Sequence, residues 1–310
     1  MPQKKRSLLD LFAGVFAASV LLTAAFFLIA PFRVVALSMA GRSTGCPLAK
    51  ALKTRSMMDA HSTLMKRYSA SSRLVSDDRE AGLELWETPK GRFWLPKNQG
   101  ELLASLLAEQ DQHIYGSGEH TVRAGDVVLD AGAHIGVFTR VAIEAGAKLV
   151  VAIEPAPKNL ECLRRNMAPE IAAGRVVIVP EGVWHEDGKL PFHMDPTNSA
   201  GNTLLHPETT RPITIEVPLT TIDKLAIRLN LPRVDFIKMD IEGAEQNALK
   251  GATKTISKDH PRMAICAYHT TTDAENIPKV VRTISASYKT ACGLCEEQDF
   301  RIIPQTLFFY

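Results

Sequence analysis

The residues best suited to chemistry form an acidic block in the C-terminal third of the chain. Residues 234–251 read Val-Asp-Phe-Ile-Lys-Met-Asp-Ile-Glu-Gly-Ala-Glu-Gln-Asn-Ala-Leu-Lys-Gly, an apolar strand that breaks into three carboxylates before a helical pattern. Asp240 stands at the carboxyl end of the strand, where open α/β sheets bind their ligands. Glu242 and Glu245 follow on one face of the helix start, where they can either serve the site or cap the helix. We therefore expect Asp240 and Glu242 to be catalytic, with Asp240 as the general base.

Two basic residues belong with these acids. Lys238 lies inside the strand, and a buried lysine is costly unless an acid pairs with it. It shares a face with Asp240, so we expect a Lys238–carboxylate pair that is either structural or sets the protonation state of Asp240. His269 ends the next apolar segment at the same sheet edge, and an ordinary pKa of about 6.5 makes it the rival base.

A second junction has the pattern of a nucleotide site. Residues 127–136 read Val-Val-Leu-Asp-Ala-Gly-Ala-His-Ile-Gly, a buried strand that turns through spaced glycines into a helical pattern over 137–143. Gly132 and Gly136 permit a sharp turn and a close approach to a ligand. A second strand, residues 149–153, ends in Glu154, roughly where a carboxylate meets ribose hydroxyls in a dinucleotide fold. These parts form one βαβ unit.

The spacing disfavours a dinucleotide. His134 stands where the dinucleotide fingerprint has its second glycine, which lets the pyrophosphate approach. Two alternative functions remain: a nicotinamide-dependent oxidoreductase on a Rossmann core, which this spacing disfavours, and a non-catalytic scaffold that kept the fold.

The motifs together resemble a known family. Asp130-x-Gly132-x-His134-x-Gly136 resembles motif I of class I S-adenosylmethionine-dependent methyltransferases. With Ala-Ile-Glu-Pro-Ala-Pro-Lys-Asn at 152–159, Leu-Thr-Thr-Ile-Asp-Lys-Leu at 219–225 and the block at 237–245, the chain is similar to the FkbM family from about Leu83 to its C-terminus. The resemblance implies a Rossmann-like doubly wound sheet, S-adenosylmethionine as cofactor, and cofactor contacts from Asp130, Gly132, Ala133, His134, Gly136, Glu154, Glu181 and Gly182.

The chemistry expected is O-methylation of a hydroxyl on a sugar, a glycan or another secondary metabolite. Transfer from a sulfonium is an in-line displacement that requires alignment and a base for the hydroxyl proton, and no metal. We therefore expect no metal site, although Asp240 and Glu242 could hold magnesium as in a catechol-type enzyme. The turn-rich loop at 195–211 is expected to be an active-site lid, and its Asn202 is the candidate substrate contact.

The N-terminus predicts a membrane anchor over residues 1–40. Residues 11–30 carry no charge and are long enough to span a bilayer as a single helix, after Lys4-Lys5-Arg6. A cleaved signal peptide is the alternative, because Ser38-Met39-Ala40 resembles a cleavage site. Because S-adenosylmethionine is a cytosolic metabolite, we expect a single-pass membrane protein whose catalytic domain faces the cytosol.

Two further parts complete the expected organisation. Residues 41–78 predict a polar stalk with a helix and no core of its own, and residues 79–310 the methyltransferase domain, with a hairpin at 83–95, a helix at 101–110 and the βαβ core from about 121. Five cysteines are too few and too scattered for a disulfide framework, and we expect Cys292-Gly-Leu-Cys295 to form a turn between two late strands. A net charge of +2 predicts no nucleic-acid partner, which leaves the membrane and a small-molecule or glycan substrate.

Overall fold

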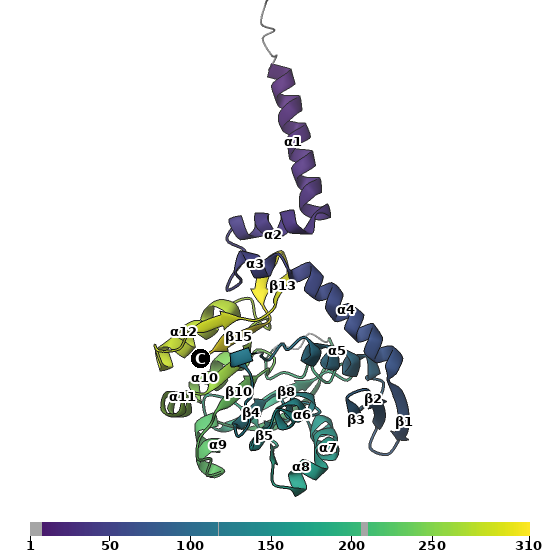
Figure 1. Cartoon of the computed structure of the whole chain (residues 1–310), viewed down its shortest axis with the longest axis vertical. Helices are drawn as coiled ribbons and strands as arrows, with labels where there is room; N and C mark the ends of the chain where they lie inside the picture. The colour runs from purple at the N-terminus through teal and green to yellow at the C-terminus, as the bar shows by residue number, and fades with distance from the viewer. Residues whose placement is uncertain (1–7, 117, 206–209) are drawn as a thin grey trace, which may run out of the picture.

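A β-sheet of seven strands forms the centre of the molecule (Figure 1). The computed structural model describes residues 8–116, 118–205 and 210–310. The strands of the sheet are β4 (Val127–Ala131), β5 (Leu149–Ile153), β6 (Val176–Val179), β10 (Phe236–Met239), β11 (Arg262–Cys266), β12 (Thr290–Cys292) and β15 (Thr306–Phe309).

The strand order confirms the predicted doubly wound fold. The strands lie in the order β12-β15-β11-β10-β4-β5-β6, and β15 runs antiparallel to both of its neighbours. The pairs β10–β11, β10–β4, β4–β5 and β5–β6 are parallel. The chain winds outward in opposite directions from β4 and β10, so the switch point at which such sheets bind ligands lies at the carboxyl ends of these two strands.

The inner strands are apolar throughout because both of their faces are buried. Successive residues point to opposite faces of the sheet: Val128 and Phe236 join one hydrophobic cluster, and Leu129 and Ile237 join the other. The first cluster is covered by α6 (Val137–Glu144) and α7 (Pro157–Asn166). The second is covered by α9 (Ile222–Arg228), α10 (Glu245–Lys250), α11 (Thr253–Asp259) and α12 (Asp273–Ile284).

Short elements fill the connections. A small sheet has the order β7-β9-β8, and β13 pairs with β14 in a hairpin. The bounds are α8 (Ala168–Ala172), β7 (Gly182–Val183), β8 (Gly188–Met194), β9 (Ile213–Thr220), β13 (Cys295–Gln298), β14 (Arg301–Pro304) and the 3-10 turn η1 (Gly118–His120).

An extension precedes the core. Its elements are α3 (Leu48–Ala51), α4 (Thr54–Ser71), β1 (Arg73–Asp78), β2 (Leu83–Thr88), β3 (Gly91–Pro96) and α5 (Gly100–Asp111). The predicted hairpin is present as β2 and β3, and β1 adds a third antiparallel strand from within the predicted stalk. Tyr68 of α4 is buried, and its hydroxyl donates to Asp111 at 2.6 Å. Residues 41–78 therefore pack into the domain and do not stand apart as a polar stalk.

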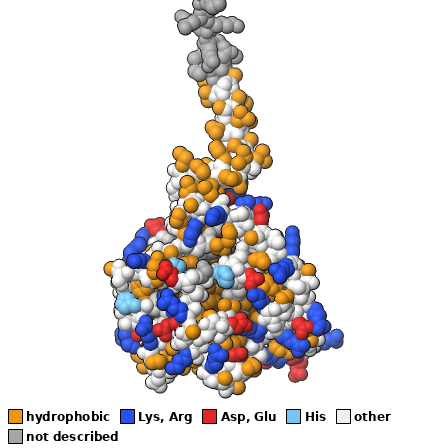
Figure 2. All heavy atoms as spheres, in the orientation of Figure 1, with side chains coloured by type: hydrophobic (Ala, Val, Ile, Leu, Met, Phe, Trp, Pro, Cys, Tyr) orange, Lys and Arg blue, Asp and Glu red, His pale blue; other side chains and the backbone are white. Residues whose placement is uncertain are grey.

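The predicted single transmembrane helix is not supported. Within the described part of the chain, none of the helices alone combines the length and apolar composition of a membrane span. Only α1 (Leu8–Leu28) and α2 (Ala30–Met39) together meet these criteria, and they are bent by 106° at the break between them. The apolar side chains of α1 project uncovered from the body of the molecule (Figure 2), as at Phe16, Leu21 and Leu28.

Pro31 explains the bend. A proline within a helix lacks the N–H that would bond four residues back, and its ring clashes with that carbonyl. Arg33 compensates, because its guanidinium donates to the carbonyl oxygens of Phe26 at 3.5 Å and Phe27 at 3.3 Å. The same side chain pairs with Glu297 of β13 at 2.8 Å, so the bend is attached to the domain that contains the seven-stranded sheet.

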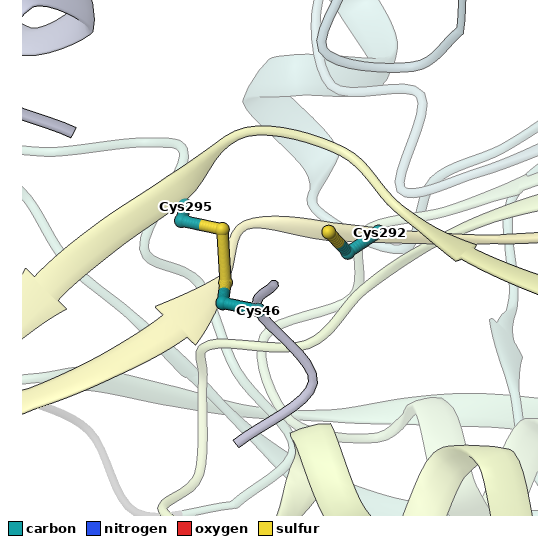
Figure 3. A group of neighbouring side chains, drawn as sticks. All are labelled: Cys46, Cys292 and Cys295. Carbon is teal, nitrogen blue, oxygen red and sulfur yellow. A yellow bond between two sulfur atoms is a disulfide. The ribbon is translucent and has the colours of Figure 1, made fainter. Parts of the chain in front are cut away.

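A disulfide makes a second attachment, which the sequence analysis did not predict. Cys46 and Cys295 are bonded across 249 residues of chain, with Cys292 beside them (Figure 3). Cys292 and Cys295 end β12 and begin β13, so the predicted turn between two late strands is confirmed. The prediction excluded a disulfide framework and did not foresee this single bond, because α2 and α3 bring Cys46 to a strand that is remote in sequence.

Candidate active site

A cavity of about 450 Å³ opens at the carboxyl ends of β4, β5 and β10. This is the edge at which doubly wound sheets bind ligands. The predicted site residues that line it are Gly132, Ala133, His134, Glu154, Lys238, Asp240, Glu242, His269 and Asn202. Asp130, Gly136, Glu181 and Gly182 are not among the residues that line it.

The turn after β4 requires glycine at position 132. Gly132 has a φ of +78°, and a Cβ there would lie 1.8 Å from the carbonyl oxygen of Asp240. The loop therefore presses directly on the end of β10. This close approach joins the predicted cofactor turn to the predicted catalytic strand, and any side chain at this position would separate them.

Glu154 is a buried carboxylate at the cavity wall, immediately after β5. It accepts the backbone N–H of His134 and of Ala156, each at 2.9 Å. Burial raises the pKa of Glu154 to about 7, although these two N–H groups favour its charged form. The carboxylate is thus fixed where a ribose hydroxyl can donate to it.

His134 has a structural place in the cofactor turn. Its φ is +52°, and its Nε2 lies 2.7 Å from the Ser199 hydroxyl, so the ring connects the turn to the 195–205 loop. Burial, followed by the nearby Lys238 ammonium, lowers the pKa of His134 to about 3. The ring is therefore neutral at pH 7.

Lys238 forms the predicted pair, and its partner is Asp130. Lys238 Nζ lies 3.3 Å from Asp130 Oδ1, and the two residues are neighbours in register between β10 and β4. The ammonium also donates to the carbonyl oxygen of Gly132 at 2.7 Å. Burial opposes the charge, but Asp130 raises the pKa of Lys238 above its ordinary value. Asp130 itself is fully buried and away from the cavity wall, so it acts on the turn through Lys238 and does not contact a ligand in the cavity.

The acidic block and His269 meet at one point. His269 Nε2 lies 3.3 Å from Asp240 Oδ1 and 3.5 Å from Glu242 Oε1. Its Nδ1 lies 3.0 Å from Glu245 Oε1, which also accepts the backbone N–H of Ile241. Tyr115 donates its hydroxyl to Asp240 Oδ2 at 2.5 Å. Glu242 adopts a φ of +55°, a costly conformation for a residue with a side chain.

The charges in this cluster are strongly coupled. Burial disfavours a charged imidazole, but Glu245, Asp240 and Glu242 together raise the pKa of His269 well above its ordinary value. Burial alone would raise the pKa of Asp240, but hydrogen bonding to His269 and the charge of Lys238 lower it below its ordinary range. In the ligand-free protein, Asp240 is therefore an anion and a weak base, and His269 already holds its proton.

The extension contributes two residues that the sequence analysis did not assign to the site. Tyr115 follows α5, and Glu109 lies on the α5 face that also carries Leu102 and Leu106 into the cavity wall. Burial and the charge of Asp240 raise the pKa of Glu109 to about 8. A lone acid continuing the Leu102–Leu106 spacing was the signal available in the sequence.

Three predicted cofactor residues have other roles. Glu181 forms an ion pair with Arg228 at 2.6 Å. Gly182 lies in β7 against the Leu219 side chain, and Gly136 begins α6 with a φ of +91° against Leu163. All three lie close in sequence to cavity residues, but their own contacts are with neighbouring elements.

Asn202 reaches the cavity from the predicted lid. Its side-chain oxygen accepts the backbone N–H of Asp195 at 2.9 Å, which closes the loop on itself. Residues 206–209 of this loop lie outside the described residues. Its contact with a substrate stays a prediction.

Comparison with known proteins finds that this chain is similar to methyltransferases. The methyltransferase FkbM domain model matches residues 130–302. The hexuronic acid methyltransferase AglP of Haloferax volcanii is 27% identical over 177 residues, which cover 57% of this chain and 70% of that protein. Methyltransferase 1 of Beauveria bassiana is 29% identical over 144 residues, covering 40% of this chain and 57% of that protein.

A solved structure of a methyltransferase FkbM from Methylobacillus flagellatus KT is similar with a TM-score of 0.45 and 21% identity. The similarity covers 84% of this chain and 60% of that one.

Proposed function

Because the chain belongs to the FkbM family of methyltransferases, we propose that it transfers a methyl group from S-adenosylmethionine to a hydroxyl group of a sugar or glycan. The observation that carries the proposal is the buried Glu154 carboxylate beside the Gly132 turn, at the switch point of the sheet. In this position the carboxylate accepts hydrogen bonds from the two ribose hydroxyls of an adenosyl group. The turn at 132–134 then lies against the methionine part.

The reaction places the acceptor hydroxyl beside Asp240. The acceptor oxygen attacks the methyl carbon as the carbon–sulfur bond breaks, which yields S-adenosylhomocysteine, and the proton of the acceptor hydroxyl passes to the Asp240 carboxylate. Asp240 lines the cavity as an anion, so its carboxylate can accept a hydrogen bond from the acceptor hydroxyl and orient the lone pair of that hydroxyl. The acidic cluster also favours the positive sulfonium of the donor.

Two observations support a sugar as the acceptor. The relative from Haloferax volcanii is named a hexuronic acid methyltransferase. The cavity wall also carries Asn159, Ser199 and Asn202, polar side chains that suit a ligand rich in hydroxyl groups.

Calorimetry followed by a transfer assay tests the proposal. The full chain should bind S-adenosylhomocysteine and not NAD, and Glu154→Gln should weaken that binding. With S-adenosylmethionine carrying a deuterated methyl group, mass spectrometry should find the label on an oxygen of a hexuronic acid glycoside. Binding of NAD alone would overturn the cofactor assignment, and labelling of an amine in place of a hydroxyl would overturn the acceptor class.

We also propose that α1 attaches the enzyme to a membrane, with the catalytic domain on the cytosolic side where the methyl donor is made. The Cys46–Cys295 disulfide is the observation that opposes this side, because such bonds are typical of oxidising compartments. Helix α1 meets the length and composition of a membrane span only together with α2, as a bent pair. Most of its large apolar side chains have no cover in the molecule. Protease protection in sealed vesicles tests the orientation: the catalytic domain should be digested only when the cytosolic face is outward.

A further inference from the structure

Three ligand atoms of the kinds that bind metal ions converge at the cavity wall. They are His269 Nε2, Asp240 Oδ1 and Glu242 Oε1, and all three lie within 4.8 Å of one another. The imidazole nitrogen is 3.3 Å from one carboxylate oxygen and 3.5 Å from the other. Neighbouring ligands of an octahedral ion with bonds of about 2.1–2.4 Å are themselves about 3.0–3.4 Å apart. The two nitrogen–oxygen spacings are close to this range, and the two carboxylate oxygens lie within 4.8 Å of each other, so a small shift of the side chains would bring all three atoms around one ion.

Two of these atoms are buried and face each other. His269 Nε2 and Asp240 Oδ1 lie 3.3 Å apart as an ion pair, and the His269 side chain is only 6% exposed. Beyond this mutual contact neither atom has a hydrogen-bond partner, although buried polar atoms are normally well satisfied. A metal ion in place of the Nε2 proton would bond to both atoms.

Neighbouring residues hold the His269 and Asp240 side chains through the atoms that do not face the cluster, namely His269 Nδ1 and Asp240 Oδ2. Glu245 Oε1 lies 3.0 Å from His269 Nδ1, so Nδ1 keeps its proton when a metal displaces the proton on Nε2, and Nε2 then has a lone pair for the metal. Tyr115 donates to Asp240 Oδ2 at 2.5 Å, which leaves Oδ1 directed at the cluster. A carboxylate–histidine–metal arrangement with a hydrogen-bonded carboxylate ligand is the usual outer support of a metal site.

We propose that His269, Asp240 and Glu242 bind one divalent cation, of the Mg²⁺ or Mn²⁺ class, at the wall of the cavity. Two carboxylates and one imidazole from one face leave the opposite positions open for water or for oxygen atoms of a ligand. The binding of the cation does not depend on the proposed function, but its role does. If the chain is a hydroxyl methyltransferase, an acceptor hydroxyl bound to the cation would lose its proton more easily.

Binding of Mn²⁺ tests the site without measuring activity. Titration of the full chain, followed by electron paramagnetic resonance, should show one bound ion per chain. His269→Ala should weaken this binding at least ~100-fold, and Glu245→Gln by about 10–100-fold, because outer partners tune metal affinity. His193→Ala is the matched control, since His193 lies on β8 beside Thr214 and outside the cluster, and it should bind Mn²⁺ as the parent chain does.

Other outcomes would overturn the site. Circular dichroism and S-adenosylhomocysteine binding verify that each variant is folded, and Asp240→Asn provides a second, nearly isosteric test if His269→Ala is not. No Mn²⁺ or Mg²⁺ binding by the parent chain at about 1 mM would reject the site, as would unchanged binding in both His269→Ala and Asp240→Asn. If Mn²⁺ binds and S-adenosylhomocysteine does not, the site stands and the proposed function fails; the reverse result rejects the site alone.

Discussion

Three carboxylates at the cavity wall have different pKa values because their neighbours differ. Glu154, Glu109 and Asp240 all line it, but burial raises the pKa of Glu154 and Glu109, whereas hydrogen bonding to His269 and the charge of Lys238 lower that of Asp240. Acids in one cavity with separated pKa values can hold different protonation states at the same pH. The roles of these residues therefore follow from their neighbours more than from their residue type.

Cofactor affinity should depend on pH through Glu154. Its pKa of about 7 means that the carboxylate is mostly protonated at pH 6 and mostly ionised at pH 8. Ribose hydroxyls bind the ionised form better, so S-adenosylhomocysteine affinity should rise about tenfold between these pH values. Glu154→Gln should remove this rise and weaken binding about 10–100-fold at pH 8.

Calorimetry at several pH values measures the effect, with Glu186→Gln as the control because Glu186 is exposed on the surface. The contribution of Glu154 to the free energy of unfolding should fall as the pH rises, whereas the cofactor affinity should increase. The folded state holds the proton of Glu154 up to about pH 7, whereas the unfolded chain loses it near pH 4.5. The contribution of this group to stability is therefore present at low pH and is lost as the pH rises to about 7. Affinity that falls with rising pH would contradict the assignment.

Replacing Asp240 should affect turnover. Asp240→Asn keeps the shape and removes the charge that orients and receives the acceptor hydroxyl, so kcat should fall by roughly 10²–10⁴-fold. S-adenosylhomocysteine affinity should change little, because Glu154 and the 132–134 turn hold the cofactor. Steady-state kinetics with both substrates separates the two effects. Intact kcat with weakened cofactor binding would make Asp240 a cofactor-positioning residue.

The site residues that the sequence predicted correctly are those that stand at or near the carboxyl ends of parallel strands. Lys238, Asp240 and His269 meet because parallel strands end at a common edge, and alternation along the strand predicted the buried Lys238 pair. Glu181 and Gly182 also follow a strand, but neither lines the cavity: Glu181 pairs with Arg228, and Gly182 packs against Leu219. Glu109 could not be placed by this rule because its position depends on how α5 packs across the sheet edge.

Between elements, the Lys238–Asp130 pair joins the two central strands. Lys238→Met leaves the Asp130 carboxylate buried without its charge partner, so the free energy of unfolding should fall by about 3–5 kcal/mol. Adding Asp130→Asn should restore part of the loss, because the uncompensated charge is then removed. Denaturant unfolding of both variants and of the parent chain measures this. A double variant as unstable as the single one would show that the charge is not the cause.

The disulfide should stabilise the attachment of the N-terminal elements. Cys46→Ala releases a closure of 249 residues, so we expect a loss of about 2–4 kcal/mol under non-reducing conditions. Dithiothreitol should reproduce the loss in the parent chain and add nothing in the variant. Cys292→Ala is the control, since Cys292 is a free buried thiol beside the bonded pair. Equal stability of Cys46→Ala and the parent chain would show that the bond does not form in solution.

Elements with a strong local pattern were predicted well, and those set by long-range packing were not. The βαβ unit and the β2–β3 hairpin were predicted from apolar runs and turn residues. Strand β1 is polar and mostly exposed, so its sequence lacks the apolar alternation on which the hairpin prediction relied. Pro31 was the visible signal for the break after α1, but hydrophobicity alone does not register it.

For the molecule as a whole, the extension is part of the catalytic unit. Helix α5 supplies Glu109 to the cavity wall and packs with α4 and the β1–β3 sheet in one hydrophobic cluster. Helix α2 buries Val34 and Leu37 in the main core. A boundary at residue 79, expected from composition, therefore falls inside a packed unit. Composition reports polarity, whereas packing depends on which few apolar residues face the core.

Truncation at two positions should separate membrane attachment from folding. A chain beginning at Ala30 loses α1 and keeps α2, the Arg33–Glu297 pair and the disulfide, so it should stay folded. We expect the full chain to resist carbonate extraction and this shorter chain not to, because α1 carries the uncovered apolar surface. A chain beginning at Arg79 should aggregate, since removal of α4 and β1 exposes the cluster around Leu83 and Phe93.

Membrane sedimentation and circular dichroism of the three chains measure these outcomes. Carbonate-resistant sedimentation of the chain beginning at Ala30 would move the attachment from α1 to another surface. A mature N-terminus near Gly41 in the full-length protein would show that the apolar segment is a cleaved signal peptide, because cleavage after Ser38-Met39-Ala40 removes both α1 and α2. Cleavage would also remove Arg33, so Glu297 would lose its ion-pair partner while the Cys46–Cys295 bond remained.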